Sequence, residues 1–202
     1  MNTEQNPKTW KQDFIELVKF VAIVLVIIIP IRIFIAQPFI VNGDSMVPTL
    51  TNGDYLIVDE ISYTLGNTIQ RGDVVVFRFP DDNNRFLIKR IIGLPEENVT
   101  ISGDTITITK ADSTEIVQLN ETYLNGPFSS YGTWELGPED YFVMGDNRRE
   151  SSDSRSWGLL KKDLIIGKTF LRLFPISQVQ YQPGEYQPEE IETLLPAIVK
   201  SE

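Results

Sequence analysis

Residues 86–92 read Phe86-Leu87-Ile88-Lys89-Arg90-Ile91-Ile92, an apolar run with two adjacent cations inside it. Branched and aromatic residues over a run of this length predict a β-strand. Alternation along a strand places Lys89 and Arg90 on opposite faces, so each cation lies among hydrophobic neighbours. Two interpretations are open. Either one cation faces solvent while the other pairs with a carboxylate, or Lys89 is desolvated and partly neutral.

Short β runs separated by Gly-Asp turn pairs continue on both sides of this strand. Val74 to Phe77 shows no alternation of apolar and polar residues, so it should be buried on both faces. Thr105 to Thr109 does alternate, so one of its faces should be exposed to solvent. Ser102-Gly103-Asp104 is typical of a tight hairpin. We therefore expect a mainly β fold of antiparallel sheets over residues 36–177. The candidate strands are Tyr55 to Ile61, Asp73 to Phe79, Phe86 to Ile92, Val99 to Ile101, Thr105 to Thr109, Ile116 to Leu119, Tyr141 to Met144 and Leu164 to Leu173.

An apolar segment precedes this β-rich region. As a helix, residues 14–35 would reach about 33 Å, enough for a bilayer core of about 30 Å. The alternatives are a buried core element and a cleaved signal peptide, although the acidic residues near the start do not suit the latter. Lys8, Lys11 and Lys19 lie on the amino side of the segment and only Arg32 lies near its other end, which predicts a cytoplasmic N-terminus.

Four segments follow from these patterns. Residues 1–13 are expected in the cytoplasm, residues 14–35 as a single transmembrane helix, and residues 36–177 as the catalytic domain on the outer side of the cell membrane. A thylakoid membrane is the alternative if the source is photosynthetic. Residues 178–202 are rich in proline and glutamate and are predicted to be a mobile acidic tail, with one short helix at residues 191–195.

Composition limits the chemistry. The net charge of -10 excludes nucleic acid as a partner, because a phosphate-binding protein needs a basic face. The chain has no histidine and no cysteine, and no loop has calcium-ligand spacing, so we expect neither a metal nor another cofactor. A serine hydroxyl needs a base, and without histidine the best remaining base is a lysine kept neutral by burial. Lys89 has the most apolar setting of any lysine after the first 36 residues.

Four ordered motifs resemble the type I signal peptidases, which are membrane-anchored serine proteases that remove signal peptides from exported precursors. After the apolar segment, the resemblance extends to Gly158. The motifs are Ser45-Met46-Val47-Pro48-Thr49-Leu50; Arg71-Gly72-Asp73-Val74-Val75-Val76-Phe77 with Pro80; Lys89-Arg90-Ile91-Ile92-Gly93-Leu94-Pro95; and Gly145-Asp146-Asn147-Arg148 followed by Ser151, Asp153-Ser154-Arg155 and Trp157-Gly158.

The resemblance implies a serine-lysine dyad in which Ser45 attacks the peptide bond and neutral Lys89 takes its proton. The Ser45 N–H would stabilise the oxyanion, and Gly43 could add only its own N–H. Ser151 would hydrogen-bond the Lys89 amine. An ionic cluster of Asp146, Asp153, Arg155 and Arg90 would hold the lysine strand against the loop that carries Ser151.

The resemblance also implies partners and specificity. Precursor proteins and the lipid bilayer are the expected partners, and cleavage should follow small residues in an Ala-x-Ala pattern, because shallow pockets reject larger groups. The residues expected to line these pockets are Phe39, Val41, Met46, Leu87 and Ile88, with Leu50 assigned instead to the core.

Two other functions stay open. A self-cleaving repressor-type protease shares the dyad but would need a DNA-binding module where this chain has its apolar segment. A membrane-tethered β domain that binds exported proteins without cutting them is the non-enzymatic alternative.

Overall fold

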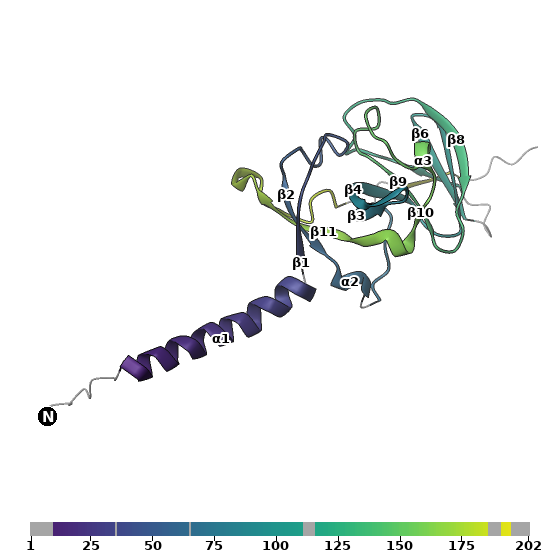
Figure 1. Ribbon diagram of the computed structural model, residues 1–202. Coiled ribbons are helices and arrows are strands. Elements are labelled where there is room, and N and C mark those ends of the chain that lie inside the picture. Colours follow the sequence, from purple (N-terminus) through teal and green to yellow (C-terminus); the bar gives the residue numbers. More distant parts are fainter. Residues whose placement is uncertain (1–9, 35, 65, 111–115, 186–190, 195–202) are drawn as a thin grey trace, which may run out of the picture.

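The computed structural model describes residues 10–34, 36–64, 66–110, 116–185 and 191–194. A long helix, α1 (Trp10–Phe34), precedes a body made almost entirely of antiparallel strands. Figure 1 shows α1 projecting away from this body. The expected mainly β, antiparallel fold is confirmed.

Helix α1 covers most of the segment predicted to span a membrane, and large apolar side chains such as Phe14, Phe20 and Val26 are exposed along it. In the part of the chain that the structure describes, no helix is long and apolar enough to cross a membrane. The predicted transmembrane span over residues 14–35 is therefore not confirmed.

The larger sheet has eight strands in the order β1-β2-β11-β3-β4-β9-β10, with β12 paired to β11. Strand β4 lies inside it between β3 and β9, and Lys89 is opposite Val75 while Arg90 is opposite Met144. The lysine strand therefore has a neighbour on each edge. The strands are β1 (Ala36–Ile40), β2 (Tyr55–Asp59), β3 (Val74–Phe79), β4 (Asp82–Gly93), β9 (Asp140–Met144), β10 (Leu160–Lys161), β11 (Ile165–Phe174) and β12 (Gln180–Tyr181).

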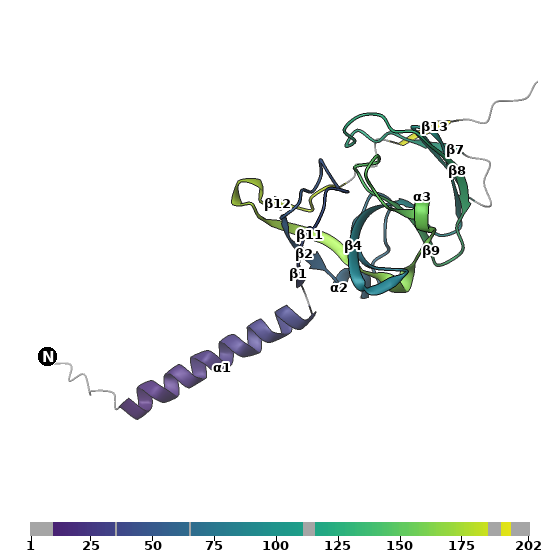
Figure 2. The same cartoon turned by 45° about the horizontal axis from the view of Figure 1, so that its top comes forward.

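The second sheet has five strands in the order β13-β7-β6-β5-β8, and it lies on the side of the body away from α1 (Figure 2). The predicted hairpin is present, since Ser102 pairs with Thr105 and Gly103 takes a φ of +68° that glycine favours. Buried and half-buried residues alternate along β6 as expected. The strands are β5 (Glu97–Gly103), β6 (Thr105–Lys110), β7 (Ile116–Leu119), β8 (Ser130–Glu135) and β13 (Ile191–Leu194).

Only short helices interrupt the sheets. They are α2 (Ile61–Thr64), α3 (Ser154–Trp157), and the 3-10 turns η1 (Lys162–Leu164) and η2 (Ile176–Gln178).

Strands β4 and β9 are shared by two apolar clusters. Ile92 and Phe142 pack in the cluster under the second sheet, whereas Ile91 and Val143 pack in a cluster with Phe77. Close packing on both faces leaves β4 little freedom to shift. The two cations at positions 89 and 90 are therefore held on a rigid strand.

The segment predicted to be a tail differs from expectation in two places. The Pro183 carbonyl accepts a hydrogen bond from Thr169 Oγ1 at 3.4 Å, and the Gln182 N–H donates to the Phe170 carbonyl at 2.8 Å. The predicted helix at residues 191–195 is wrong, because Ile191–Leu194 is strand β13 paired with β7. Main-chain pairing at a sheet edge decides this conformation, and acidic, proline-rich composition does not reveal it. Residues 186–190 and 195–202 of the predicted tail lie outside the described residues.

Candidate active site

Ser45 lies in the loop that connects β1 to β2. The base of this loop is closed by the Val41 N–H, which donates to the Asp54 carbonyl at 2.9 Å. Met46 and Leu50 follow the serine and are fully buried in a cluster with Leu56. The apolar side chains therefore anchor the turn and leave Ser45 at its surface, next to β4.

Lys89 reaches Ser45 from strand β4. Its Nζ donates to Ser45 Oγ at 2.7 Å and to the Ile88 carbonyl at 2.9 Å. Only 3% of Lys89 is exposed, and burial lowers its pKa from the ordinary value of 10.5 to about 8. The charges of Asp153 and Asp146 oppose this shift, and that of Arg85 adds to it. Lys89 is thus desolvated, as the second of the two interpretations has it, and the first, in which one cation faces solvent, is wrong.

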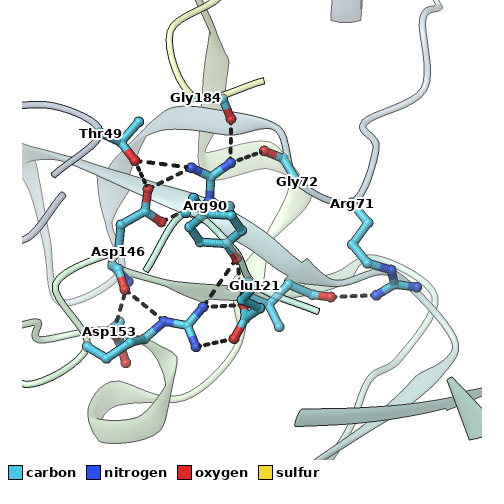
Figure 3. Close-up of polar contacts among 12 residues, drawn as sticks. Thr49, Arg71, Gly72, Arg90, Glu121, Asp146, Asp153 and Gly184 are labelled. Atoms are coloured by element: carbon cyan, nitrogen blue, oxygen red, sulfur yellow. Dashed lines mark hydrogen bonds and ion pairs between the residues drawn. The ribbon is translucent and has the colours of Figure 1, made fainter. Parts of the chain in front are cut away.

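Arg90 lies on the other face of β4 and keeps its charge. Its Nε donates to Asp146 Oδ1 at 2.9 Å and its Nη2 to Oδ2 at 2.6 Å, so the pair is bidentate (Figure 3). Burial would lower the pKa of Arg90, but the hydrogen bonds and charge of Asp146 raise it. The predicted pairing of Arg90 with a carboxylate is present.

The Arg90–Asp146 pair also connects distant segments of the chain. Asp146 Oδ2 accepts a short hydrogen bond from Thr49 Oγ1, four residues after the serine. Arg90 Nη1 donates to the carbonyls of Gly72 and Gly184 (Figure 3). A side chain at Gly184 would clash with Thr49, so the chain approaches the arginine closely only because this residue is glycine.

Asp153 and Arg155 form a second ion pair on the loop after β9. Arg155 Nη2 lies 2.8 Å from Asp153 Oδ2, and the same oxygen accepts the Gly145 N–H at 3.1 Å. Asp153 also caps the short helix α3. The four expected cluster residues thus form two separate pairs that brace β4 and the loop after β9.

Two further residues of this ionic region, Glu121 and Tyr123, have no signal in the sequence patterns, whereas Arg148 belongs to the fourth motif. Arg148 makes a bidentate pair with Glu121, and the Tyr123 ring lies 3.9 Å from the Arg90 guanidinium carbon. Glu121 and Tyr123 come from the segment between β7 and β8, far from the four motifs. Only the folded arrangement brings them to Arg90 and Arg148.

Two expected contacts differ in the structure. Ser151 Oγ is buried and has no hydrogen-bond partner among the described residues, so the expected bond to the Lys89 amine is not present. The side chain packs against Gly145, beside the Ser45 carbonyl. The Gly43 N–H, at a φ of +100°, donates to Asn52 Oδ1 at 3.0 Å.

A cavity of about 90 Å³ opens beside the dyad and is bordered by both Ser45 and Lys89. Four of the expected pocket residues line it: Phe39, Val41, Leu87 and Ile88. Met46 does not, because its side chain is turned into the core with Leu50. The lining residues that the sequence did not indicate are Ile40, Asn42, Leu56, Val76 and Phe86.

Several known proteins similar to this chain belong to one family. Residues 14–174 match the family model described as signal peptidase, peptidase S26. The chain is 31% identical over 192 residues to signal peptidase IB of Staphylococcus aureus strain MRSA252, which covers 89% of this chain and 97% of that protein. It is 34% identical over 180 residues to signal peptidase I of Leptolyngbya laminosa, covering 85% and 83%.

Solved structures are similar too, and one of them is of a signal peptidase. It is a crystal structure of a signal peptidase I from Enterococcus faecalis V583, with 31% identity and a TM-score of 0.44, and it covers 50% of this chain and 96% of that one. The family match and the sequence relatives together establish that the chain belongs to the signal peptidase family of peptidases, as the four motifs predict.

Proposed function

We propose that this protein removes signal peptides from exported precursors as a serine endopeptidase, with Ser45 as nucleophile and Lys89 as general base. The observation that carries the proposal is the 2.7 Å separation of Lys89 Nζ and Ser45 Oγ at a buried, desolvated amine. Burial favours the neutral amine, whose lone pair can accept a proton at that distance. Family membership supports the reaction class.

The chemistry proceeds in two stages. Neutral Lys89 takes the Ser45 proton as Oγ attacks the scissile carbonyl, and the resulting ammonium gives that proton to the departing amine, which leaves an acyl-enzyme. Lys89 then deprotonates a water that attacks the ester carbonyl, and the proton returns to Ser45 as the signal peptide is released. Lys89 thus takes up one proton in each stage, from Ser45 and then from water, and passes it on to the departing amine and then to Ser45.

Oxyanion stabilisation requires main-chain donors near Ser45. The Ser45 N–H is the first proposed donor. The Gly43 N–H is the second, and it must leave Asn52 Oδ1 in order to serve. The ion pairs of Arg90 with Asp146 and of Arg155 with Asp153 have a positioning role, since they brace the strand and loop on either side of the dyad.

Specificity for Ala-x-Ala follows from the cavity beside the dyad. Its volume of about 90 Å³ suits a small side chain and excludes a large one, and its walls are mainly apolar. Phe86 packs edge-on against Phe39 at 5.6 Å between ring centroids, which stiffens one wall. We assign Phe39, Val41, Leu87 and Ile88 to this pocket.

Attachment to a membrane through α1 is part of the proposal. The exposed apolar side chains of α1 support it, together with the apolar composition of residues 14–35. The lysines before this segment favour a cytoplasmic N-terminus and a catalytic domain on the outer side. Protease protection of sealed vesicles tests this: the β body should be digested from outside only, and its presence in the soluble fraction would contradict attachment.

The decisive experiment incubates purified protein with a precursor that has an Ala-x-Ala site. We expect cleavage after the second alanine, and its loss in both Ser45→Ala and Lys89→Ala. In a comparable catalytic triad, loss of the nucleophile costs about a millionfold. Binding without cleavage would favour the alternative of a membrane-tethered domain that binds exported proteins without cutting them. Cleavage retained by Ser45→Ala would exclude Ser45 as the nucleophile.

The pH profile of kcat/KM gives an independent check on the base. We expect a rise with an apparent pKa near 8, the value that burial gives Lys89. A rate independent of pH between 6 and 9 would contradict a lysine base.

A further inference from the structure

A second concave region borders the dyad on its Ser151 side and shares no lining residue with the cavity beside Lys89. One part, of about 110 Å³, reaches Val47, two residues after the serine. The other part, of about 690 Å³, reaches Ser151. Arg148 and Arg149 line both parts, and we call the two parts together the arginine groove.

The arginine groove is attached directly to the nucleophile loop. The Asn147 N–H donates to the Ser45 carbonyl at 3.0 Å, and Asn147 Nδ2 donates to the Asp44 carbonyl at 3.1 Å. Ser151 packs beside the same Ser45 carbonyl, against Gly145. A peptide bound across Ser45 therefore meets the cavity beside Lys89 on one side and the arginine groove on the other.

One cation in the arginine groove is not compensated. Arg148 is neutralised by Glu121 and Arg155 by Asp153, while the carboxylate of Asp146 is neutralised by Arg90. Arg149 is exposed and has no ion pair or hydrogen bond among the described residues. The neighbouring Glu150 is also exposed, and its Oε2 accepts a hydrogen bond from Asn147 Nδ2 at 3.3 Å, so the groove has an unpaired cation at Arg149 and a carboxylate held toward Asn147.

We propose that the arginine groove binds the part of the precursor that follows the cut, and that Arg149 selects an acidic side chain there. The inference depends on the proposed peptidase function. Residues before the cut occupy the small apolar cavity, so the departing chain must leave across the Ser151 side. Arg149 is two residues after Asn147, whose N–H donates to the Ser45 carbonyl, and an extended peptide advances about 3.3 Å per residue, so Arg149 should be within reach of the first four residues after the cut.

The experiment compares precursor peptides that differ only after the cut. Each has the same Ala-x-Ala site and carries one glutamate or one lysine at the first, second, third or fourth following position. We expect the wild-type kcat/KM to favour glutamate over lysine by about threefold to fivefold at one position, the range of an exposed charge pair. The preference should vanish near 1 M salt, where charges are screened within about 3 Å.

A series at one position assigns the effect to its source. Arg149→Lys should keep the preference, Arg149→Gln should reduce the ratio to about one, and Arg149→Glu should favour lysine. Lys162→Glu makes the same charge change at an exposed position outside the groove and should keep the wild-type ratio.

The outcomes separate the two proposals. If no peptide is cleaved by the wild type, the peptidase function fails. If all peptides are cleaved but the glutamate-to-lysine ratio is one at every position, or is unchanged in Arg149→Glu, only the arginine groove assignment fails.

Discussion

On one side of strand β4 Lys89 is 3% exposed, and on the other side Arg90 is 1% exposed, so both cations are removed from water to the same degree. Their partners differ. Lys89 donates to a serine hydroxyl and a main-chain carbonyl, whereas Arg90 donates twice to the Asp146 carboxylate. Burial lowers the pKa of Lys89 to about 8, while Asp146 raises that of Arg90.

The comparison shows that burial alone does not decide the charge of a group. A formal negative charge in direct contact offsets desolvation, and neutral acceptors do not. The two sides consequently serve different purposes. The charged side joins β4 to Thr49, Gly72, Asp146 and Gly184, and so holds the nucleophile loop and the residues after β12 in place. The neutral side supplies a base.

Removing the carboxylate from the charged side should have the largest effect on stability. Asp146→Asn leaves the Arg90 guanidinium buried without a counter-ion, which costs about 3 to 5 kcal/mol. We expect the free energy of unfolding, measured with urea, to fall by that amount. Asp163→Asn removes an exposed carboxylate and should change it by less than about 0.5 kcal/mol. Equal effects of the two substitutions would mean that the Arg90–Asp146 pair does not support the fold.

Removing the amine from the neutral side should have the opposite sign. The folded pKa of Lys89, about 8, lies below its ordinary value of 10.5, so the unfolded chain binds a proton more tightly and Lys89 destabilises the fold below pH 8. A shift of this size corresponds to about 3 kcal/mol. Lys89→Met should therefore raise the free energy of unfolding at pH 7, by less than this amount because two hydrogen bonds are lost.

The difference between Lys89→Met and the wild type should shrink as the pH rises from about 8 to 10.5, because the wild type takes up a proton on unfolding in this range and its free energy of unfolding therefore rises with pH. Urea unfolding at several pH values measures this. Lys162→Met, at an exposed position, should show no such trend. A Lys89→Met protein that is less stable than the wild type at pH 7 would contradict a desolvated amine.

The strands that the sequence did not predict share one property. All eight candidate strands are present, but β1, β8, β10, β12 and β13 were missed, and each lies at an edge of its sheet or off its main path. An edge strand needs no apolar residues on both faces, so its composition stays close to that of a loop. Pro38 in β1 and Gly132 in β8 further hide the pattern.

The candidate site was predictable to the extent that its residues lie in ordered motifs. Lys89 stands out from its apolar neighbours, and the motifs indicate Asp146 and Asp153. Thr49, although inside a motif, was not expected to bond Asp146, and Glu121, Tyr123 and Gly184 lie outside the motifs. Their contacts to Asp146, Arg148 and Arg90 exist only because three separate loops converge in the folded chain. Sequence periodicity carries no information about such convergence.

Ser151→Ala should change stability less than the substitutions above, and it tests which groups hold the Lys89 amine on the neutral side of β4. Its buried hydroxyl has no partner among the described residues, and such a group in a native fold calls for a functional explanation. Once Ser45 Oγ becomes an ester, Lys89 loses its 2.7 Å partner, and we expect Ser151 Oγ to take that place as a positioning residue.

Ser151→Ala should change the free energy of unfolding by less than about 1 kcal/mol. It should also lower kcat/KM by about tenfold or more and move the apparent pKa of the pH profile, because the amine loses its remaining side-chain partner. Ser152→Ala, which changes the exposed neighbouring serine on the same loop, should leave both quantities nearly unchanged. An unaltered pH profile in Ser151→Ala would mean that Lys89 works without a hydroxyl on that side.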